Sequence, residues 1–156
     1  MKFKITLKID RKHGDLLPFN YQYEQSAVIY RILAQADTQY SSWLHENGYQ
    51  LNGSKRFKLF CYSPFIFEKV RPLPKEGCLN IMGERATWYI SFIPEKSTME
   101  FIQGIFAHQS FTIGNRKYQV AFDVVGVEAI PMPQLSEEMT FVALSPICVK
   151  LHEDNK

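Results

Sequence analysis

The chain has 156 residues, of which 46% are hydrophobic and 14% aromatic; this is enough for one domain with a buried core and excludes a disordered protein. Its net charge of +2 excludes a histone-like polycation but allows the local basic patch that nucleic-acid binding requires. Three scattered cysteines without a CxxC motif argue against a structural zinc site or a disulfide framework.

The first predicted element is a strand over residues 2–9, where lysine or threonine alternates with apolar residues. This alternation interrupts any apolar run, so the amino terminus does not read as a secretory signal. No segment of the chain approaches the roughly 20 apolar residues of a membrane span. We therefore expect a cytoplasmic protein.

Two helices are predicted next. Residues 21–36 have helical periodicity, and their apolar face is made of Gln25, Val28, Ile29, Ile32, Leu33 and Ala36. Asp37 and Thr38 indicate a break and a new N-cap. A second, short helix then buries Tyr40, Trp43 and Leu44 and ends at Gly48.

The remaining pattern alternates strands with one more helix. Strands are expected over residues 58–70, with Pro64 marking an edge or a bulge, and over residues 86–93. Residues 97–100 resemble a capping box that opens a helix with Met99, Ile102, Ile105 and Phe106 on one side. Strands follow at residues 116–130 and 139–151. This order predicts an α+β, ferredoxin-like βαββαβ sandwich, with helices on one face of an antiparallel sheet.

The adjacent pair His45 and Glu46 suggests a metalloprotease, but the motif HExxH fails because Tyr49 stands where the second histidine should be. The other histidines are scattered, so we expect no metal and no cofactor. Phosphate-binding loops of the GxxxxGK[ST] and GxGxxG types are absent from the sequence, and so is the nucleophile motif GxSxG.

Residues that could transfer protons without a metal remain. Tyr30 and Tyr23 lie off the apolar face of the first helix, and His45 lies off that of the second. The helix C-terminus near His45 favours a protonated imidazole, which a general acid needs. A basic run of Lys55, Arg56 and Lys58 follows and could hold a phosphate.

Each of these residues also has an ordinary structural explanation. The tyrosines could pack beneath a neighbouring element, and the histidine and the basic run could simply be solvated. Together they could cleave RNA by taking the 2′-hydroxyl proton, protonating the 5′ oxygen and stabilising the charged phosphorane. Composition and spacing alone do not select this chemistry over others.

Five stretches in this order narrow the choice: LPFNYQYEQSAVIYRIL, ADTQYSSWLHENGY, FKLFCYSPF, FIQGIF and FVALSPICV. Together they resemble the CRISPR-associated endoribonucleases of the RAMP superfamily, which cut repeat RNA into guide units. The resemblance extends from Lys2 to about Leu151 and implies metal-independent cleavage that leaves a 2′,3′-cyclic phosphate and a 5′-hydroxyl.

The same resemblance implies roles for individual residues. Tyr30 would act as the general base or orient the 2′-hydroxyl, His45 would act as the general acid, and Lys58 would stabilise the transition state. Lys55 is the alternative lysine if the loop aligns differently. The RNA-binding residues that we expect are Tyr23, Arg31, Lys55 and Arg56.

The resemblance also bears on domain organisation. We expect residues 1–151 to form one ferredoxin-like domain and residues 152–156 a tail, without the second ferredoxin-like domain that this family usually has. The expected partner is CRISPR repeat RNA. Two alternatives stay open: a non-catalytic RNA-binding module, and an interaction protein that forms a homodimer or needs the missing domain as a partner chain.

Overall fold

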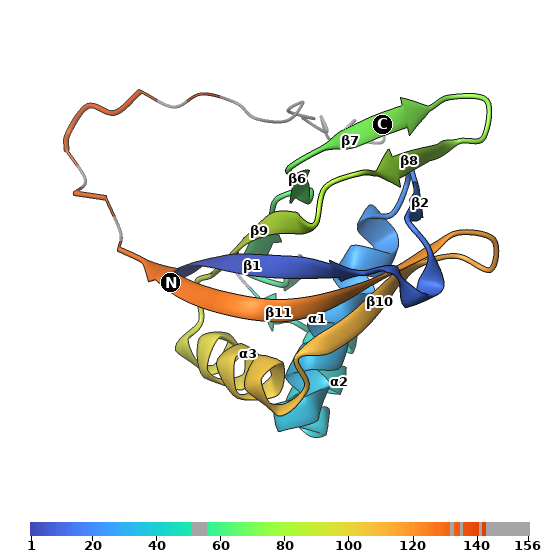
Figure 1. Ribbon diagram of the computed structural model, residues 1–156. Coiled ribbons are helices and arrows are strands. Elements are labelled where there is room, and N and C mark those ends of the chain that lie inside the picture. The colour runs from blue at the N-terminus through green and yellow to red at the C-terminus, as the bar shows by residue number, and fades with distance from the viewer. Residues whose placement is uncertain (51–55, 132, 135, 141, 143–156) are drawn as a thin grey trace, which may run out of the picture.

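The structure, a computed structural model, describes the chain except for residues 51–55, 132, 135, 141 and 143–156 (Figure 1). Its centre is a curled antiparallel sheet with the strand order β10-β11-β1-β9-β5, in which β6 also pairs with β9. The bounds of these strands are Lys2–Asp10 for β1, Phe60–Tyr62 for β5, Ile66–Phe67 for β6, Arg85–Phe92 for β9, Ser110–Gly114 for β10 and Gln119–Ile130 for β11.

Three helices lie on one side of this sheet: α1 (Gln22–Ala36), α2 (Thr38–Glu46) and α3 (Glu95–Ala107) (Figure 1). Helix α2 packs against α1. If β5 and β6 are taken as one interrupted strand, the order β11-β1-β9-β5/β6 is the 4-1-3-2 order that a βαββαβ chain produces. The predicted ferredoxin-like α+β fold is therefore confirmed, with β10 added beside β11.

The sequence pattern explains the central strand and the first helix. In β1 the apolar residues Phe3, Ile5, Leu7 and Ile9 are buried, while the intervening lysines lie on the opposite face. In α1 the predicted apolar face is buried except for Ala36, which is half-buried. The helix ends at Asp37, whose carboxylate accepts a hydrogen bond from the Tyr40 N–H at 2.8 Å and caps α2, as predicted.

Three details of the predicted helices are wrong. The third helix begins at Glu95, not at residue 97, so Ser97 is not a cap; it is buried and hydrogen-bonded to the hydroxyl of Tyr40. On α3 the buried residues include Phe101 and Gly104, whereas Met99 and Phe106 are exposed. Trp43 on α2 is 39% exposed rather than buried.

The predicted strand at residues 58–70 is shorter and interrupted. Ser63 still bonds to β9, because its N–H donates to the Tyr89 carbonyl and its hydroxyl accepts from the Tyr89 N–H. Pro64 then separates β5 from β6 at the edge of the sheet, which confirms the prediction that this proline marks an edge.

Several short elements were not predicted. A second sheet has the order β2-β8-β7, and a small ladder joins β3 to β4. Their bounds, with that of the 3-10 turn η1, are Arg11–His13 (η1), Leu16–Pro18 (β2), Tyr49–Gln50 (β3), Arg56–Phe57 (β4), Val70–Leu73 (β7) and Cys78–Ile81 (β8).

The strand predicted at residues 139–151 falls almost entirely outside the described residues. In the part of the chain that the structure describes, no helix has both the length and the apolar character needed to cross a membrane.

Candidate functional site

Two of the predicted site residues meet where α2 folds back against α1. The rings of Tyr30, on α1, and His45, on α2, lie edge-on with centroids 5.0 Å apart and an interplanar angle of 84°. The two helices are held together here because the Ser41 hydroxyl donates a 2.8 Å hydrogen bond to the Tyr30 carbonyl. Buried Leu44 anchors α2, and the adjacent His45 is exposed, as the helical phase predicted.

Tyr30 is half-buried between this histidine and the sheet. Its ring also contacts Phe60 edge-on, at a centroid distance of 5.8 Å. Burial raises the pKa of the Tyr30 phenol above its usual value, and nearby Tyr62 raises it further. The phenol therefore stays neutral at physiological pH and can both donate and accept a hydrogen bond.

Lys58, the last residue of the basic run, reaches the same place from the segment between β4 and β5. Its ammonium donates hydrogen bonds to the carbonyls of Leu44 and His45, the latter at 2.5 Å. These carbonyls belong to the last turn of α2, where backbone acceptors have no partner within the helix. Burial lowers the pKa of Lys58, and the charge of Arg56 lowers it further.

The structure thus brings Tyr30 to the ring of His45 and Lys58 to its backbone carbonyl. An ammonium has three N–H donors, and the contacts above use two, which leaves one for an incoming anion as far as the described residues are concerned. Arg56 is nearby and donates to the Glu46 carbonyl at 3.3 Å. Lys55, the alternative lysine, lies outside the described residues.

The other two predicted RNA-binding residues lie on a different surface. Tyr23 is 82% exposed and lines a hollow between α1 and β10 together with Arg31 and Thr112. The Arg31 guanidinium donates to the Thr112 carbonyl at 3.3 Å. The two tyrosines of α1 therefore have different surroundings, because only Tyr30 contacts His45.

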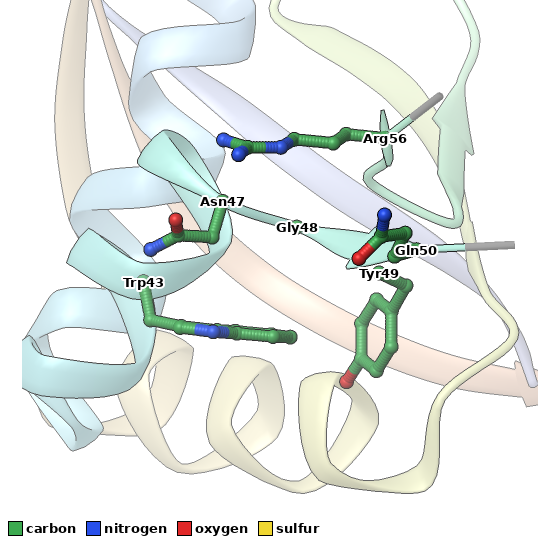
Figure 2. Close-up of a pocket in the computed structure, with 6 residues that line it drawn as sticks. All are labelled: Trp43, Asn47, Gly48, Tyr49, Gln50 and Arg56. Atoms are coloured by element: carbon green, nitrogen blue, oxygen red, sulfur yellow. The ribbon is translucent and has the colours of Figure 1, made fainter. Parts of the chain in front are cut away.

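A second hollow lies at the C-terminal end of α2, and the sequence did not predict it. Its lining combines exposed aromatic, amide and guanidinium groups at the end of α2 (Figure 2), from Trp43, Asn47, Gly48, Tyr49, Gln50 and Arg56. The sequence does hold one sign of this hollow, because Trp43 is close along the chain to Gly48 and to the basic run. The helical phase, however, predicted that the indole is buried in the core.

Metal ligands do not gather at either hollow. Within the described residues, no group of three or more His, Cys, Asp or Glu side chains is placed to hold a metal ion.

Comparison with known proteins identifies the family. The sequence model described as "CRISPR-associated protein Cas6, N-terminal" matches residues 16–123, which include Tyr30, His45 and Lys58. The chain belongs to the Cas6 family. The resemblance predicted from the sequence motifs is thereby confirmed.

The relatives of this Cas6-family chain are longer than it is. It is 29% identical to "CRISPR-associated endoribonuclease Cas6 1" of Methanocaldococcus jannaschii, over 94% of the chain and 52% of the relative. It is 26% identical to "CRISPR-associated endoribonuclease Cas6" of Pyrococcus furiosus, over 100% of the chain and 55% of the relative. The chain thus spans about half the length of the curated relatives it matches.

Solved structures agree on the fold of this Cas6-family chain. A structure described as a Cas6-related gene product from Pyrococcus furiosus superposes with a TM-score of 0.68 and 22% identity, over 87% of this chain and 50% of that one. Another, described as a RAMP protein binding different RNA substrates, superposes with a TM-score of 0.67 and 22% identity, over 88% of this chain and 51% of that one. At these identities the likeness shows the fold.

Proposed function

We propose that this Cas6-family chain cuts CRISPR repeat RNA by attack of a 2′-hydroxyl on the adjacent phosphate, without a metal. The observation that carries the proposal is the edge-on contact of Tyr30 with His45, next to an ammonium bonded to the His45 carbonyl. The curated relatives are named endoribonucleases, which supports RNA cleavage as the reaction class.

In the proposed reaction the 2′ oxygen bonds to phosphorus and the bond from phosphorus to the 5′ oxygen breaks. The products are a 2′,3′-cyclic phosphate and a 5′-hydroxyl. His45 supplies the proton to the leaving 5′ oxygen, a role that typically contributes about 10²–10⁴ in rate. Lys58 donates its remaining N–H to the phosphorane and stabilises its charge.

Tyr30 has the role of orienting the 2′-hydroxyl in this scheme. Sequence reasoning left open whether it is a base or an orienting group. Because burial raises its pKa, the phenolate needed for a base is scarce at neutral pH, which favours orientation through a hydrogen bond. The 2′-hydroxyl proton then passes to water.

The test is cleavage of repeat RNA with excess EDTA, beside an RNA that carries a 2′-deoxy group at the scissile site. We expect the first RNA to be cut and the second to stay intact. His45→Ala should lower the single-turnover rate by about 10²-fold or more, while His13→Ala, an exposed histidine on η1, should not change it. Cleavage that EDTA abolishes, or that survives the 2′-deoxy change, contradicts the mechanism.

The alternative, a non-catalytic RNA-binding module, is favoured by the exposed ring of Tyr23 beside Arg31. It predicts salt-sensitive binding without product at long times in the same assay. A homodimer or a second chain as partner stays a prediction, which light scattering tests.

A further inference from the structure

The hollow at the end of α2, here called the slot, has flat side chains on opposite sides. Figure 2 shows the indole of Trp43 edge-on at one side, the Arg56 side chain on the opposite side, and the amides of Asn47 and Gln50 toward its two ends. Indoles and guanidinium groups both stack on aromatic rings, and amides can form hydrogen bonds with the nitrogen and oxygen atoms at the edge of a heterocyclic ring. These groups match an unpaired nucleobase.

The indole is held in place from the protein side. It stacks on Tyr40, with centroids 5.8 Å apart and an interplanar angle of 23°, and contacts Tyr49 edge-on at 5.1 Å. Tyr40 is in turn buried, and its hydroxyl is hydrogen-bonded to the hydroxyl of Ser97. Trp43 nevertheless remains 39% exposed, so a rigid aromatic surface faces outward at little cost in side-chain entropy.

The slot adjoins the proposed phosphate site through Gly48. This residue lines the slot, and a Cβ added to it would lie 3.4 Å from the Lys58 ammonium and 2.7 Å from the Phe57 carbonyl. Its φ of +69° also favours glycine. The backbone that forms the back of the slot therefore also covers Lys58, and a nucleotide whose base enters the slot lies next to that ammonium.

We infer that the slot between Trp43 and Arg56 binds an unpaired RNA base next to the phosphate held by Lys58. The inference rests on the proposed function for the identity of that phosphate. Stacking selects for single-stranded RNA at this position, because a paired base is covered on both faces by its neighbours in the helix. The slot thereby determines where along an RNA the reactive phosphate can sit.

The test uses a 2′-O-methyl oligoadenylate of about ten nucleotides, within the usual site size of single-strand-binding domains. It cannot react by 2′-hydroxyl attack, so its binding does not depend on the proposed cleavage. The comparison ligand is an abasic oligomer with the same number of phosphates. We expect Trp43→Ala to weaken oligoadenylate binding about 5- to 150-fold, the effect of one stacked base, and to leave abasic binding unchanged.

Two further variants separate stacking from folding. Trp43→Phe keeps an aromatic surface and should lose less affinity than Trp43→Ala, and Phe106→Ala, which removes an exposed ring on α3, should change nothing. Arg56→Lys keeps the charge but loses the flat guanidinium, so it should weaken oligoadenylate more than the abasic oligomer.

Tryptophan fluorescence gives an independent readout. Because Trp88 is fully buried, the exposed Trp43 should account for the quenching that oligoadenylate causes, and Trp43→Phe should remove it. Equal loss of affinity for both ligands in the Trp43 variants, or no loss, overturns the inference. Cleavage of repeat RNA by the same samples is measured separately. If the protein cuts RNA but the Trp43 variants lose no more affinity for oligoadenylate than for the abasic oligomer, the inference about the slot is wrong and the proposed function still stands.

Discussion

The ring of Tyr30 packs against other side chains, whereas in the proposed reaction its hydroxyl contacts the RNA. One substitution can therefore separate the packing role of the ring from the role of the hydroxyl. Tyr30→Phe keeps the contacts with His45 and Phe60 and removes only the hydroxyl. We expect the single-turnover rate to fall about 5- to 30-fold, because an orienting hydrogen bond is worth about 1–2 kcal/mol. RNA binding, measured by filter retention, should change little.

The matched control is Tyr118→Phe, a tyrosine that stacks with Lys117 away from the histidine. An unchanged rate in Tyr30→Phe would show that the hydroxyl has no part in the reaction and that the ring acts only as packing.

Two buried tyrosines and one half-buried tyrosine make the fold sensitive to alkali. Burial raises the pKa of Tyr21, Tyr30 and Tyr40. Above the unfolded tyrosine pKa of about 10, the unfolded chain loses protons that the folded chain retains, so stability is present below that pH and falls as pH rises through the folded values. Thermal unfolding should therefore show a Tm that declines from about pH 9.5 upward.

Tyr30→Phe should make this decline shallower, since one of the three groups no longer ionises. A Tm curve of unchanged slope in this variant would show that Tyr30 ionises equally easily in the folded and unfolded chain.

The sequence predicted the exposure of a side chain well where the periodicity of a single helix or strand decides which way that side chain points. His45 was placed off the apolar face of its helix from the phase of Tyr40 and Leu44, and it is exposed. Trp43 shares the phase of those anchors, yet it is 39% exposed. Its ring contacts Tyr40 of its own helix and Tyr49 of β3, and the phase of one helix does not specify the position of Tyr49.

Helices α1 and α3 touch at Gly104. A Cβ there would lie 1.8 Å from the Ile32 carbonyl oxygen, which is backbone and cannot move without shifting α1. Gly104→Ala should therefore destabilise the protein despite the higher helix propensity of alanine, which favours it by about 1 kcal/mol. We expect a net loss of about 1–3 kcal/mol in urea unfolding, as for other overpacked cores.

The neighbouring Gln103→Ala is the control, because Gln103 is exposed on the same helix and should retain the wild-type midpoint. A stabilised Gly104→Ala would mean that the two helices are further apart in solution.

Length explains which elements could be predicted. The nine-residue strand β1 and the fifteen-residue helix α1 carry enough periodic positions to be recognised. The ladders β3–β4 and β2–β8 involve two or three residues each, and only the tertiary fold brings them together. The start of α3 was misplaced because Pro94, rather than the polar Ser97, precedes its first turn.

At the scale of the whole molecule, the near-neutral net charge limits electrostatic binding. If Arg31, Arg56 and Lys58 each neutralise one phosphate, the logarithm of the RNA association constant should fall with the logarithm of salt concentration with a slope of about −2, at roughly 0.7 per phosphate. Fluorescence anisotropy with labelled single-stranded RNA between low and moderate salt measures this slope. A slope several times steeper would mean that other cations, such as Lys55, carry the binding.

The topology was predictable because the order of elements, βαββαβ, permits few arrangements of the sheet. The candidate site was predictable only in part. Its residues were identified by their positions in motifs, but the contact of Lys58 with the end of α2 depends on how the chain returns after residue 55, which periodicity does not describe.

The interruption at Pro64 also has a consequence for solubility. An unbroken outer strand would present a row of N–H and C=O groups on which a strand of another molecule could add, the first step of aggregation. Here proline lacks the N–H, and the strand is divided into segments of three and two residues, β5 and β6. This edge of the sheet therefore offers no continuous template for intermolecular pairing, although no further strand within the described residues covers it.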